Sequence, residues 1–347
     1  MKDKIIGFGD FLLRLNPEGY LRFSQADRMQ TYFTGAEANV CVSLRCMGMK
    51  TEFVTRVPDN DIARAGLGQL SKYRVGLEHV ALGGERLGVF YVEKGASQRP
   101  SKVIYDRKYS AICTASPTDF CWPEILRDAA WLHVTGITPA LGGDLPRICQ
   151  EALQTAKQMG VTVSCDLNYR QKLWSPQEAG TVMRRLLPYV DVLIANEEDC
   201  ARVLGISAPD TDVEAGRLSR AGYIAVARQV CREFPNLKAV GVTLRGSVSA
   251  SDNDWAAMLY QDGTGYFSRQ YRMHIVDRVG GGDSFAAGLI YAKMHDLDAQ
   301  TAIEYAAAAS CLKHSIEMDY NLSTAEEIWA LAKGTGSGRV QRCPCPR

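Results

Sequence analysis

The sequence predicts an α/β fold in which a mainly parallel central sheet carries helices on both faces and a small β-sheet forms a lid. The central sheet is predicted because apolar, strand-like runs alternate with helical patterns along most of the 347 residues. The lid is predicted because two segments, 11–33 and 86–113, contain no good helix and have strands that are polar on one side. Crossovers within the central sheet are expected to be right-handed.

The elements of the central sheet can be placed from the apolar periodicity of the chain. Core strands are expected at 4–9, 51–56, 130–135, 161–166, 191–195 and 238–244. Helices are expected at 36–47, 60–73, 144–159, 176–187, 197–204, 212–233, 283–295, 299–314 and 324–332. The segment 252–263 is expected to form a hairpin excursion, because Asp252-Asn253-Asp254 and Asp262-Gly263 are turn signals.

The lid strands are expected at 12–15, 89–92 and 103–105. The predicted organisation is a nucleotide- and substrate-binding core (1–10, 34–85 and 114–335), a lid (11–33 and 86–113) and a flexible tail (336–347). The exposed apolar side of such a lid needs a partner, which predicts a homodimer formed through the lid. The alternative is that these segments are additions to one edge of a single sheet and form no separate lid.

Composition argues against several classes of partner. The 40 basic and 39 acidic residues nearly cancel, so we expect neither nucleic acid nor a membrane as a partner. No apolar stretch is long enough to cross a bilayer, and the chain begins on a strand rather than on a signal peptide. The eleven scattered cysteines, with Cys343 and Cys345 in the tail, suit reduced thiols in a cytoplasmic protein, and the five histidines form no zinc-ligand pair.

The glycine-rich segment 277–288 is the most informative part of the chain. Gly280, Gly281 and Gly282 directly precede Asp283 and an apolar helix. Glycine lets the backbone approach a ligand closely, and the free N–H groups and dipole of a helix N-terminus favour a phosphate there. A carboxylate beside a phosphate is unfavourable unless it does chemistry, so Asp283 is expected to take a proton from a hydroxyl that attacks phosphorus. Ordinary helix capping is the alternative.

Three further groups of residues favour a polar ligand. One is the turn from Thr34 to Asn39, which opens a helix, and another is Asp166 to Arg170, which follows a strand where open α/β sheets bind ligands. The third is a lid cluster of two tyrosines and an arginine, which suits a polyhydroxylated acid: Tyr91, Tyr105 and Arg107. A plain turn, a surface loop and simple strand packing are the respective alternatives.

Taken together, these motifs resemble those of the ribokinase/PfkB family of sugar kinases. Asp-x-x-Gly-x-Gly-Asp at 277–283 is similar to the second family signature, with Arg278 and Gly281 in place of the usual Thr and Ala. Gly35-x-x-x-Asn39 is similar to the first signature, with Thr34 in place of its first Gly. Asp-x-Asn-x-Arg at 166–170 resembles a segment of 2-keto-3-deoxygluconate kinases. The motifs occur in family order over residues 4–332.

The resemblance implies a ribokinase-like fold and a role for each matching residue. Asp283 would be the catalytic base, with Gly280, Gly281 and Gly282 as the anion cradle. Substrate would be bound by Gly35, Ala36, Asn39, Tyr91, Tyr105, Arg107, Arg170 and Asp319. ATP would be bound by Asn168, Asn196, Thr243, Arg245, Gly246, Gly280 and Gly282. Mg²⁺ would be placed indirectly by Asp199, which stands where the family has Glu, or by Glu198.

We therefore expect an ATP- and Mg²⁺-dependent kinase that phosphorylates the primary 6-hydroxyl of 2-keto-3-deoxygluconate. A ketodeoxygalactonate kinase is an alternative, because sequence does not resolve the stereochemistry of one hydroxyl. A neutral-sugar kinase of the fructokinase or ribokinase type is disfavoured, since it would give Arg107 and Arg170 nothing to pair with. A non-catalytic sugar-binding protein on the same fold would not need Asp283. A Rossmann dehydrogenase would need a third glycine and a helix after Gly7-Phe8-Gly9-Asp10.

Overall fold

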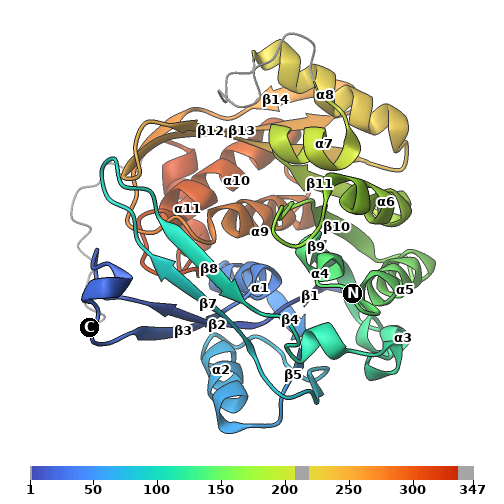
Figure 1. Ribbon diagram of the computed structural model, residues 1–347. Coiled ribbons are helices and arrows are strands. Elements are labelled where there is room, and N and C mark those ends of the chain that lie inside the picture. The colour runs from blue at the N-terminus through green and yellow to red at the C-terminus, as the bar shows by residue number, and fades with distance from the viewer. Residues whose placement is uncertain (1, 208–218, 335–347) are drawn as a thin grey trace, which may run out of the picture.

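The structure is a computed structural model that describes residues 2–207 and 219–334. Its centre is a nine-stranded sheet with the order β14-β13-β12-β11-β10-β9-β1-β4, and β15 pairs with β13 (Figure 1). The strands are β1 (Lys4–Phe8), β4 (Lys50–Val54), β9 (Ala129–Thr135), β10 (Thr162–Asp166), β11 (Val192–Ala195), β12 (Ala239–Ser247), β13 (Asp252–Gln261), β14 (Thr264–Phe267) and β15 (Tyr271–His274). Neighbours from β4 to β12 are parallel, whereas β13 is antiparallel to β12, β14 and β15. The mainly parallel sheet predicted from the sequence is therefore confirmed.

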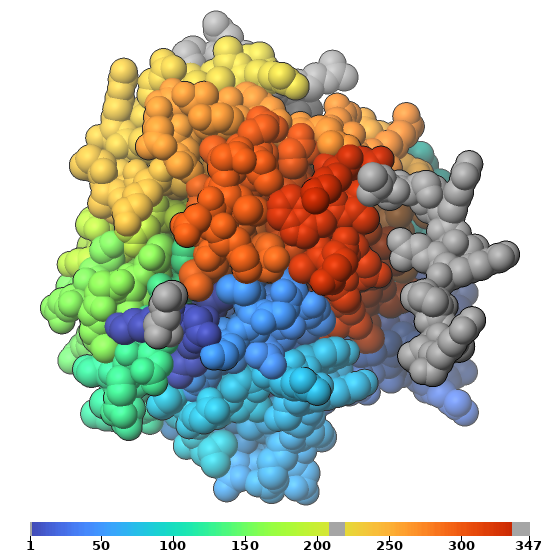
Figure 2. All heavy atoms as spheres, turned by 180° about the vertical axis from the view of Figure 1, so that it is seen from behind, coloured from blue at the N-terminus to red at the C-terminus, as the bar shows by residue number. Residues whose placement is uncertain are grey.

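Helices cover both faces of this sheet, and alternate residues of each strand pack against opposite layers. One layer contains α3 (Trp122–Ile125), α5 (Leu145–Gln158), α6 (Pro176–Leu186), α7 (Glu197–Leu204) and α8 (Arg220–Glu233). The other contains α1 (Ala36–Cys46), α9 (Gly281–Met294), α10 (Ala299–Lys313) and α11 (Ala325–Ala332). Seen from behind, the chain around α1 meets the C-terminal helices on one continuous surface (Figure 2). α9 is buried almost all round, which explains why its sequence is apolar on every face.

The small second sheet has four strands in the order β3-β2-β7-β8. They are β2 (Leu12–Asn16), β3 (Gln30–Thr34), β7 (Gly88–Glu93) and β8 (Lys102–Asp106). Leu12, Phe90 and Val92 form its small apolar core, and the sheet extends across one side of the central sheet (Figure 1). The predicted lid sheet is thus present, and β3 adds a strand that the alternation pattern did not single out.

The remaining elements are short or peripheral. α2 (Asp61–Lys72) begins at Asn60, whose side chain accepts a hydrogen bond from the Ala63 N–H. A two-stranded sheet pairs β5 (Arg56–Val57) with β6 (Ala81–Leu82), and α4 (Ile137–Ala140) follows β9. Within the described ranges, 3₁₀ turns lie at Phe23–Gln25, Ile112–Thr114, Pro117–Asp119 and Leu187–Tyr189. In the described part of the chain, no helix has the length and apolar character needed to span a membrane.

Two predicted boundaries are wrong, and both concern β12 and β13. The strand expected to end at 244 continues to Ser247, because β13 pairs with it along its whole length. Asn253 and Asp254, read as turn residues, consequently lie inside β13, whereas Asp262-Gly263 is a turn as predicted, with positive φ at both residues. The start of the helix predicted at 212–233 and the predicted tail, with Cys343 and Cys345, lie outside the described residues.

Candidate active site

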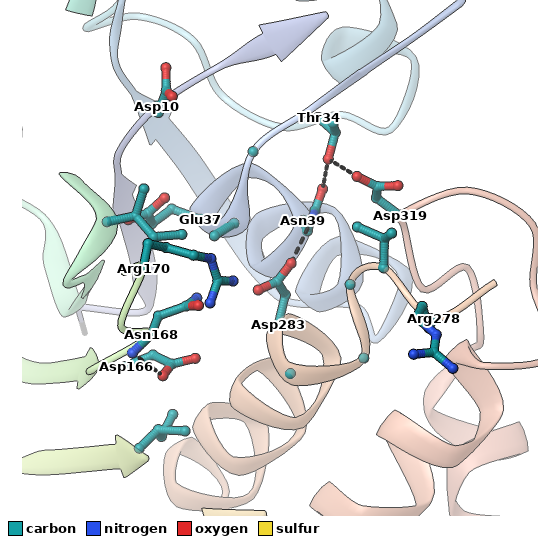
Figure 3. A pocket seen from close by; sticks show the side chains of 18 of the residues that line it. Asp10, Thr34, Glu37, Asn39, Asp166, Asn168, Arg170, Arg278, Asp283 and Asp319 are labelled. Carbon is teal, nitrogen blue, oxygen red and sulfur yellow. Dashed lines mark hydrogen bonds between the residues drawn. The ribbon is translucent and has the colours of Figure 1, made fainter. Parts of the chain in front are cut away.

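A cavity of about 390 Å³ lies at the carboxyl ends of the parallel strands, between the central sheet and the lid sheet. Its walls come from segments far apart in the sequence: the ends of β1, β10 and β11, the start of α1 and the start of α9 (Figure 3). The lid sheet contributes Leu12, Phe90 and Tyr105. This is the place where open α/β sheets bind their ligands, because the loops after parallel strands converge there.

Most of the predicted site residues meet in this one cavity. Its lining includes Gly35, Ala36, Asn39, Tyr105, Arg107, Asn168, Arg170, Asn196, Asp199, Thr243, Arg245, Gly280, Gly281, Gly282, Asp283 and Asp319. Three predicted residues lie outside the lining: Tyr91, Glu198 and Gly246. The cavity therefore brings together segments that the sequence could only place on separate elements.

The glycine-rich loop is shaped by close contacts between main-chain atoms. Gly280 has a left-handed conformation (φ 83°), and a Cβ atom there would lie 2.0 Å from the carbonyl oxygen of Asp319. Gly281 is packed against the ring of His314, whereas a Cβ on Gly282 would meet nothing within 4 Å. Two glycines are thus needed for packing, and the third leaves the N-terminus of α9 open to the cavity.

Asp283 lies in the first turn of α9 and faces the cavity (Figure 3). Its Oδ2 accepts a hydrogen bond from Asn39 Nδ2 at 2.7 Å. Burial raises the pKa of Asp283 to about 6, and the Asn39 hydrogen bond and the positive charge of Arg170 oppose this shift. A carboxylate with such a pKa is mostly ionised at neutral pH and still accepts a proton readily, as a general base requires.

The lid side of the cavity carries a cation. Arg107 Nη1 lies 3.5 Å from Asp10 Oδ2, and its guanidinium lies 4.3 Å from the ring centroid of Tyr105. Arg170 reaches the cavity from the loop after β10, where its Nη1 donates to the carbonyl of Tyr169 at 3.1 Å. Both guanidinium groups therefore line the same cavity, where either could pair with a carboxylate.

Phe90, not Tyr91, faces the cavity from β7, which corrects the prediction for Tyr91. Phe90 pairs directly with Tyr105 across β7 and β8, and the two rings stack 5.5 Å apart. Directly opposed residues share a face of the sheet, and the next residue points to the other face. Tyr91 therefore points away from the cavity.

The predicted roles of Gly246 and Glu198 also lack support from their positions. Gly246 lies within β12, where it pairs with Asp254, instead of in a turn. Glu198 is exposed on α7 and lies 3.6 Å from Arg202, one helical turn away. Asp199 lines the cavity instead, because the side chain of Asn196 caps α7 and turns this position inward.

The opposite end of the cavity carries two cations without a carboxylate partner in the described residues. Arg245 donates to Asn253 Oδ1 at 3.1 Å, and Arg278 donates to the carbonyl of Ala250 at 3.0 Å. Burial and the charge of Arg278 lower the pKa of Arg245 to about 10. Arg278 was noted from the sequence only as a departure from a motif, yet its position beside Arg245 makes it a candidate phosphate ligand.

Two acids in the cavity are of interest as metal neighbours. Burial raises the pKa of Asp166, and the nearby Asp199 and Asp283 raise it further. Burial likewise raises the pKa of Asp199 to about 6. No group of three or more histidine, cysteine or acidic side chains in residues 2–207 and 219–334 is arranged to hold a metal ion. The arrangement fits Mg²⁺ that retains water and phosphate ligands, since such an ion needs only one or two carboxylates.

Asp10 and Glu37 were not predicted as site residues. Both carboxylate oxygens of Asp10 are buried and accept no hydrogen bond within the described chain, although Arg107 Nη1 lies 3.5 Å from Oδ2. Unsatisfied buried acceptors are costly, so Asp10 is a candidate ligand of substrate hydroxyl groups. The sequence feature that could have identified Asp10 as a site residue is its position directly after the first predicted strand. Glu37 is a structural acid instead, because its Oε1 accepts hydrogen bonds from the N–H and hydroxyl of Thr135 at 2.9 and 2.8 Å.

A glycine cradle at a helix N-terminus, a facing carboxylate and a sheet that covers both define a phosphotransferase of ribokinase-like fold. The chain belongs to the pfkB family of carbohydrate kinases, since the model of that family matches residues 3–317. The family resemblance inferred from the motifs is thereby confirmed.

The chain is similar to named members of this family over nearly its whole length. It is 32% identical to a 2-dehydro-3-deoxygalactonokinase of Haloferax volcanii, over 97% of this chain and 99% of the relative. It is 27% identical to a 2-dehydro-3-deoxygluconokinase of Thermoproteus tenax, over 91% and 89%. The crystal structure of a 2-dehydro-3-deoxygluconokinase from Thermotoga maritima superposes with a TM-score of 0.92 at 49% identity, covering 96% of this chain and 100% of that one.

Proposed function

We propose that the protein is an ATP-dependent kinase that phosphorylates the primary 6-hydroxyl of 2-keto-3-deoxygluconate and yields 2-keto-3-deoxy-6-phosphogluconate. The observation that carries the proposal is the position of Asp283, which faces the cavity at the open N-terminus of α9 while Asn39 holds its carboxylate. Similarity to the Thermotoga maritima enzyme supports the substrate.

In the proposed reaction, Asp283 takes the proton from the 6-hydroxyl as the oxygen attacks the γ-phosphorus of ATP in line. The N–H groups at the start of α9 stabilise the charge on the transferring phosphoryl group. Arg245 and Arg278 hold the polyphosphate through their buried guanidinium groups. Mg²⁺ would neutralise phosphate charge beside Asp166 and Asp199. The lid sheet excludes water and thereby limits hydrolysis of ATP.

The acid group of the substrate is proposed to lie between Arg107 and Arg170. Both guanidinium groups line the cavity, and Arg107 already pairs with Asp10 there, so an acidic substrate would supply a further negative charge that a neutral sugar lacks. Asp10, Asn39 and Asp319 would accept or donate hydrogen bonds to the hydroxyl groups. In this proposal, the core predicted from the sequence binds ATP and the sugar acid, and the predicted lid closes over them.

A ketodeoxygalactonate kinase is the second candidate, because the Haloferax volcanii relative carries that activity in its name and is 32% identical. The two substrates differ in the configuration of one hydroxyl group. The deciding experiment measures ADP release with ATP and Mg²⁺ against ketodeoxygluconate, ketodeoxygalactonate, gluconate, fructose and ribose. Higher kcat/KM for ketodeoxygluconate supports the proposal, and a preference for fructose or ribose rejects it.

A homodimer through the lid sheet is also proposed. Large apolar side chains on lid segments are exposed, including Tyr20 at 51%, Leu21 at 41% and Ile104 at 52%. Ile104 lies on the edge strand β8 and the other two lie in the loop after β2, and a covering partner would explain their exposure. Light scattering should give the mass of a dimer for the wild type and that of a monomer for Ile104→Lys, and a wild-type monomer at assay concentration would reject this arrangement.

A further inference from the structure

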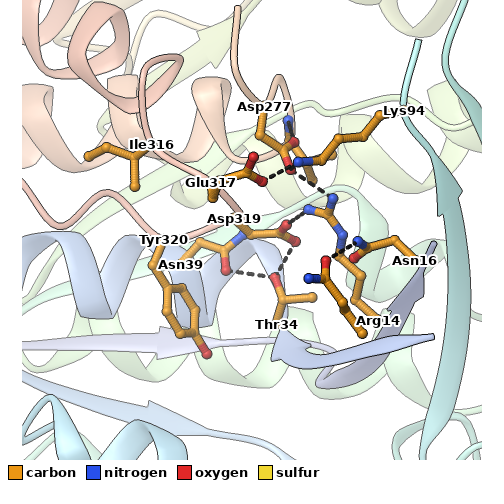
Figure 4. A network of polar contacts seen from close by, with 12 residues as sticks. Arg14, Asn16, Thr34, Asn39, Lys94, Asp277, Ile316, Glu317, Asp319 and Tyr320 are labelled. Carbon is orange, nitrogen blue, oxygen red and sulfur yellow. Dashed lines mark hydrogen bonds and ion pairs between the residues drawn. The ribbon is translucent and has the colours of Figure 1, made fainter. Parts of the chain in front are cut away.

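The cavity has a polar half next to the proposed base and an apolar half beneath the lid sheet. In the polar half, the Thr34 hydroxyl lies 2.8 Å from Asn39 Oδ1 and 2.6 Å from Asp319 Oδ2 (Figure 4). Arg14 of β2 fixes this half from the lid, because it donates to Asp319 Oδ1 and, at 2.7 Å, to Asp277 Oδ2. Hydroxyl groups of a sugar acid find donors and acceptors here.

The apolar half is a wall formed by Leu12 of β2 and Phe90 of β7. Both side chains line the cavity, and they are only 6% and 4% exposed. They belong to the small apolar core of the lid, and the Phe90 ring stacks on that of Tyr105 with 5.5 Å between the centroids. Neither side chain has an atom that donates or accepts a hydrogen bond. A hydroxyl group pressed against this apolar wall would therefore gain no partner from it.

The apolar wall lies directly beside Arg107. A Cβ atom on Gly88 would lie 2.4 Å from Leu12 Cδ2 and 2.9 Å from Arg107 Cβ, so these two side chains meet over the bare main chain of Gly88. The guanidinium of Arg107 also lies 4.3 Å from the ring centroid of Tyr105, which stacks on Phe90. An atom two bonds from a carboxylate held by Arg107 is therefore within reach of the wall.

Arg107 stands at the end of the cavity away from Asp283. Its Nη1 lies 3.5 Å from Asp10 Oδ2, and Asp10 lies well apart from Asp283 in Figure 3. A sugar acid that presents its 6-hydroxyl to Asp283 therefore directs its carboxylate, at the other end of the carbon chain, towards Arg107. Carbon 3 is two bonds from the carboxyl carbon in the open chain, and also in the ring form that leaves the 6-hydroxyl free.

We propose that Leu12 and Phe90 determine specificity by recognising the missing 3-hydroxyl of a 2-keto-3-deoxy sugar acid. The inference rests on the proposed function and on a carboxylate bound at Arg107. The CH₂ group at position 3 packs against the apolar wall, whereas a 2-keto acid with a hydroxyl at this position has to bury that hydroxyl without a hydrogen-bond partner. The hydroxyl groups at positions 4 to 6 face the polar half.

A matched pair of substrates isolates this effect. 2-Ketogluconate differs from 2-keto-3-deoxygluconate only by the hydroxyl group at position 3. An apolar pocket rejects an added hydroxyl by about 10²-fold, so we expect kcat/KM for 2-keto-3-deoxygluconate to exceed that for 2-ketogluconate by about 10- to 100-fold. A ratio near one would mean that Asp10 or another polar group accepts the 3-hydroxyl, and it overturns the inference.

Leu12→Asn places an amide in the apolar wall with little change in volume. It should lower the ratio of the two kcat/KM values by about 3- to 10-fold, because the 3-hydroxyl gains a hydrogen bond. Leu13→Asn is the matched control, since Leu13 points to the opposite face of β2 and lies outside the cavity lining. The control should retain the ratio of the wild type. A ratio that falls equally in both variants overturns the inference.

Phe90→Tyr provides a second test, should Leu12→Asn fail to fold. It adds only a hydroxyl group to a ring that already lines the cavity, and it should lower the ratio in the same direction. Phe267→Tyr on β14 is its control, because Phe267 lies outside the cavity lining. An unchanged ratio in both Leu12→Asn and Phe90→Tyr overturns the inference.

Binding measured without turnover separates this inference from the proposed function. In calorimetry with a non-hydrolysable ATP analogue and Mg²⁺, Kd for 2-ketogluconate should exceed Kd for 2-keto-3-deoxygluconate by about 10- to 100-fold, and Leu12→Asn should narrow this difference. If neither sugar acid supports ADP release, the proposed function fails, and the two Kd values still test the apolar wall. Equal Kd values for the wild type, or no binding of either sugar acid, overturn the inference.

Discussion

The glycine-rich loop and the lid sheet enclose the same cavity by different means. The loop is fixed by main-chain contact, since Gly280 lies against the carbonyl of Asp319 too closely for any side chain. The lid contributes through side chains on β8, an edge strand whose residues are mostly exposed. The comparison indicates that the residues around Asp283 are held rigidly, whereas Tyr105, which lines the cavity from β8, lies on a surface that tolerates change.

Asp283→Asn tests the glycine-rich loop side of the cavity and should have the largest effect on activity. Removal of a positioned general base costs about 10²–10⁴ in rate, so kcat should fall by this factor. Asparagine is nearly the same size, so ATP should bind with wild-type affinity in calorimetry. Turnover close to that of the wild type would show that Asp283 is not the base.

Arg170→Ala tests the sugar-binding side. Truncating one member of a buried charge pair costs roughly 2–5 kcal/mol, so KM for an acidic substrate should rise strongly with a smaller change in kcat. Slow turnover of fructose, where measurable, should be unaffected. Arg147, which pairs with Glu151 on the solvent-facing side of α5, offers a control substitution to alanine. Equal losses on acidic and neutral sugars would reject carboxylate recognition.

Gly280→Ala tests whether the loop depends on main-chain contact. A left-handed alanine costs about 1–2 kcal/mol before any clash with Asp319 is counted. We therefore expect a lower free energy of unfolding in urea together with reduced kcat. Gly282→Ala is the matched control, because its Cβ meets nothing within 4 Å. Equal stability of the two variants would contradict the role of close contact at Gly280.

The two lid tyrosines give the smallest and most local test. Tyr105→Phe removes a hydroxyl from a cavity wall. KM should rise by the factor that corresponds to the loss of one hydrogen bond, which contributes about 0.5–1.5 kcal/mol. Tyr91→Phe should leave KM unchanged, because Tyr91 lies on the opposite face of β7. Steady-state kinetics with the preferred sugar acid checks both. A larger effect for Tyr91 would mean that the face assignment of β7 is wrong.

Local motifs were predictable from the sequence, and pairing between distant strands was not. The glycines, Asp283 and the loop after β10 were found because their chemistry lies within a few neighbouring residues. Tyr91 was misassigned because the choice between Phe90 and Tyr91 depends on which residue opposes Tyr105, and strand register is not encoded locally. Arg14 was missed because its partners, Asp277 and Asp319, lie more than 260 residues away.

The contact between Gly280 and Asp319 constrains how this enzyme can diverge. The segment near residue 319 contacts the glycine-rich loop through backbone atoms, so remodelling it for another carbohydrate would displace the N-terminus of α9. The β7–β8 hairpin also contacts this loop, because Lys94 lies 3.8 Å from Asp277. Exchange of the cavity-lining side chains Phe90 and Tyr105 should therefore preserve turnover better than exchange of the whole hairpin.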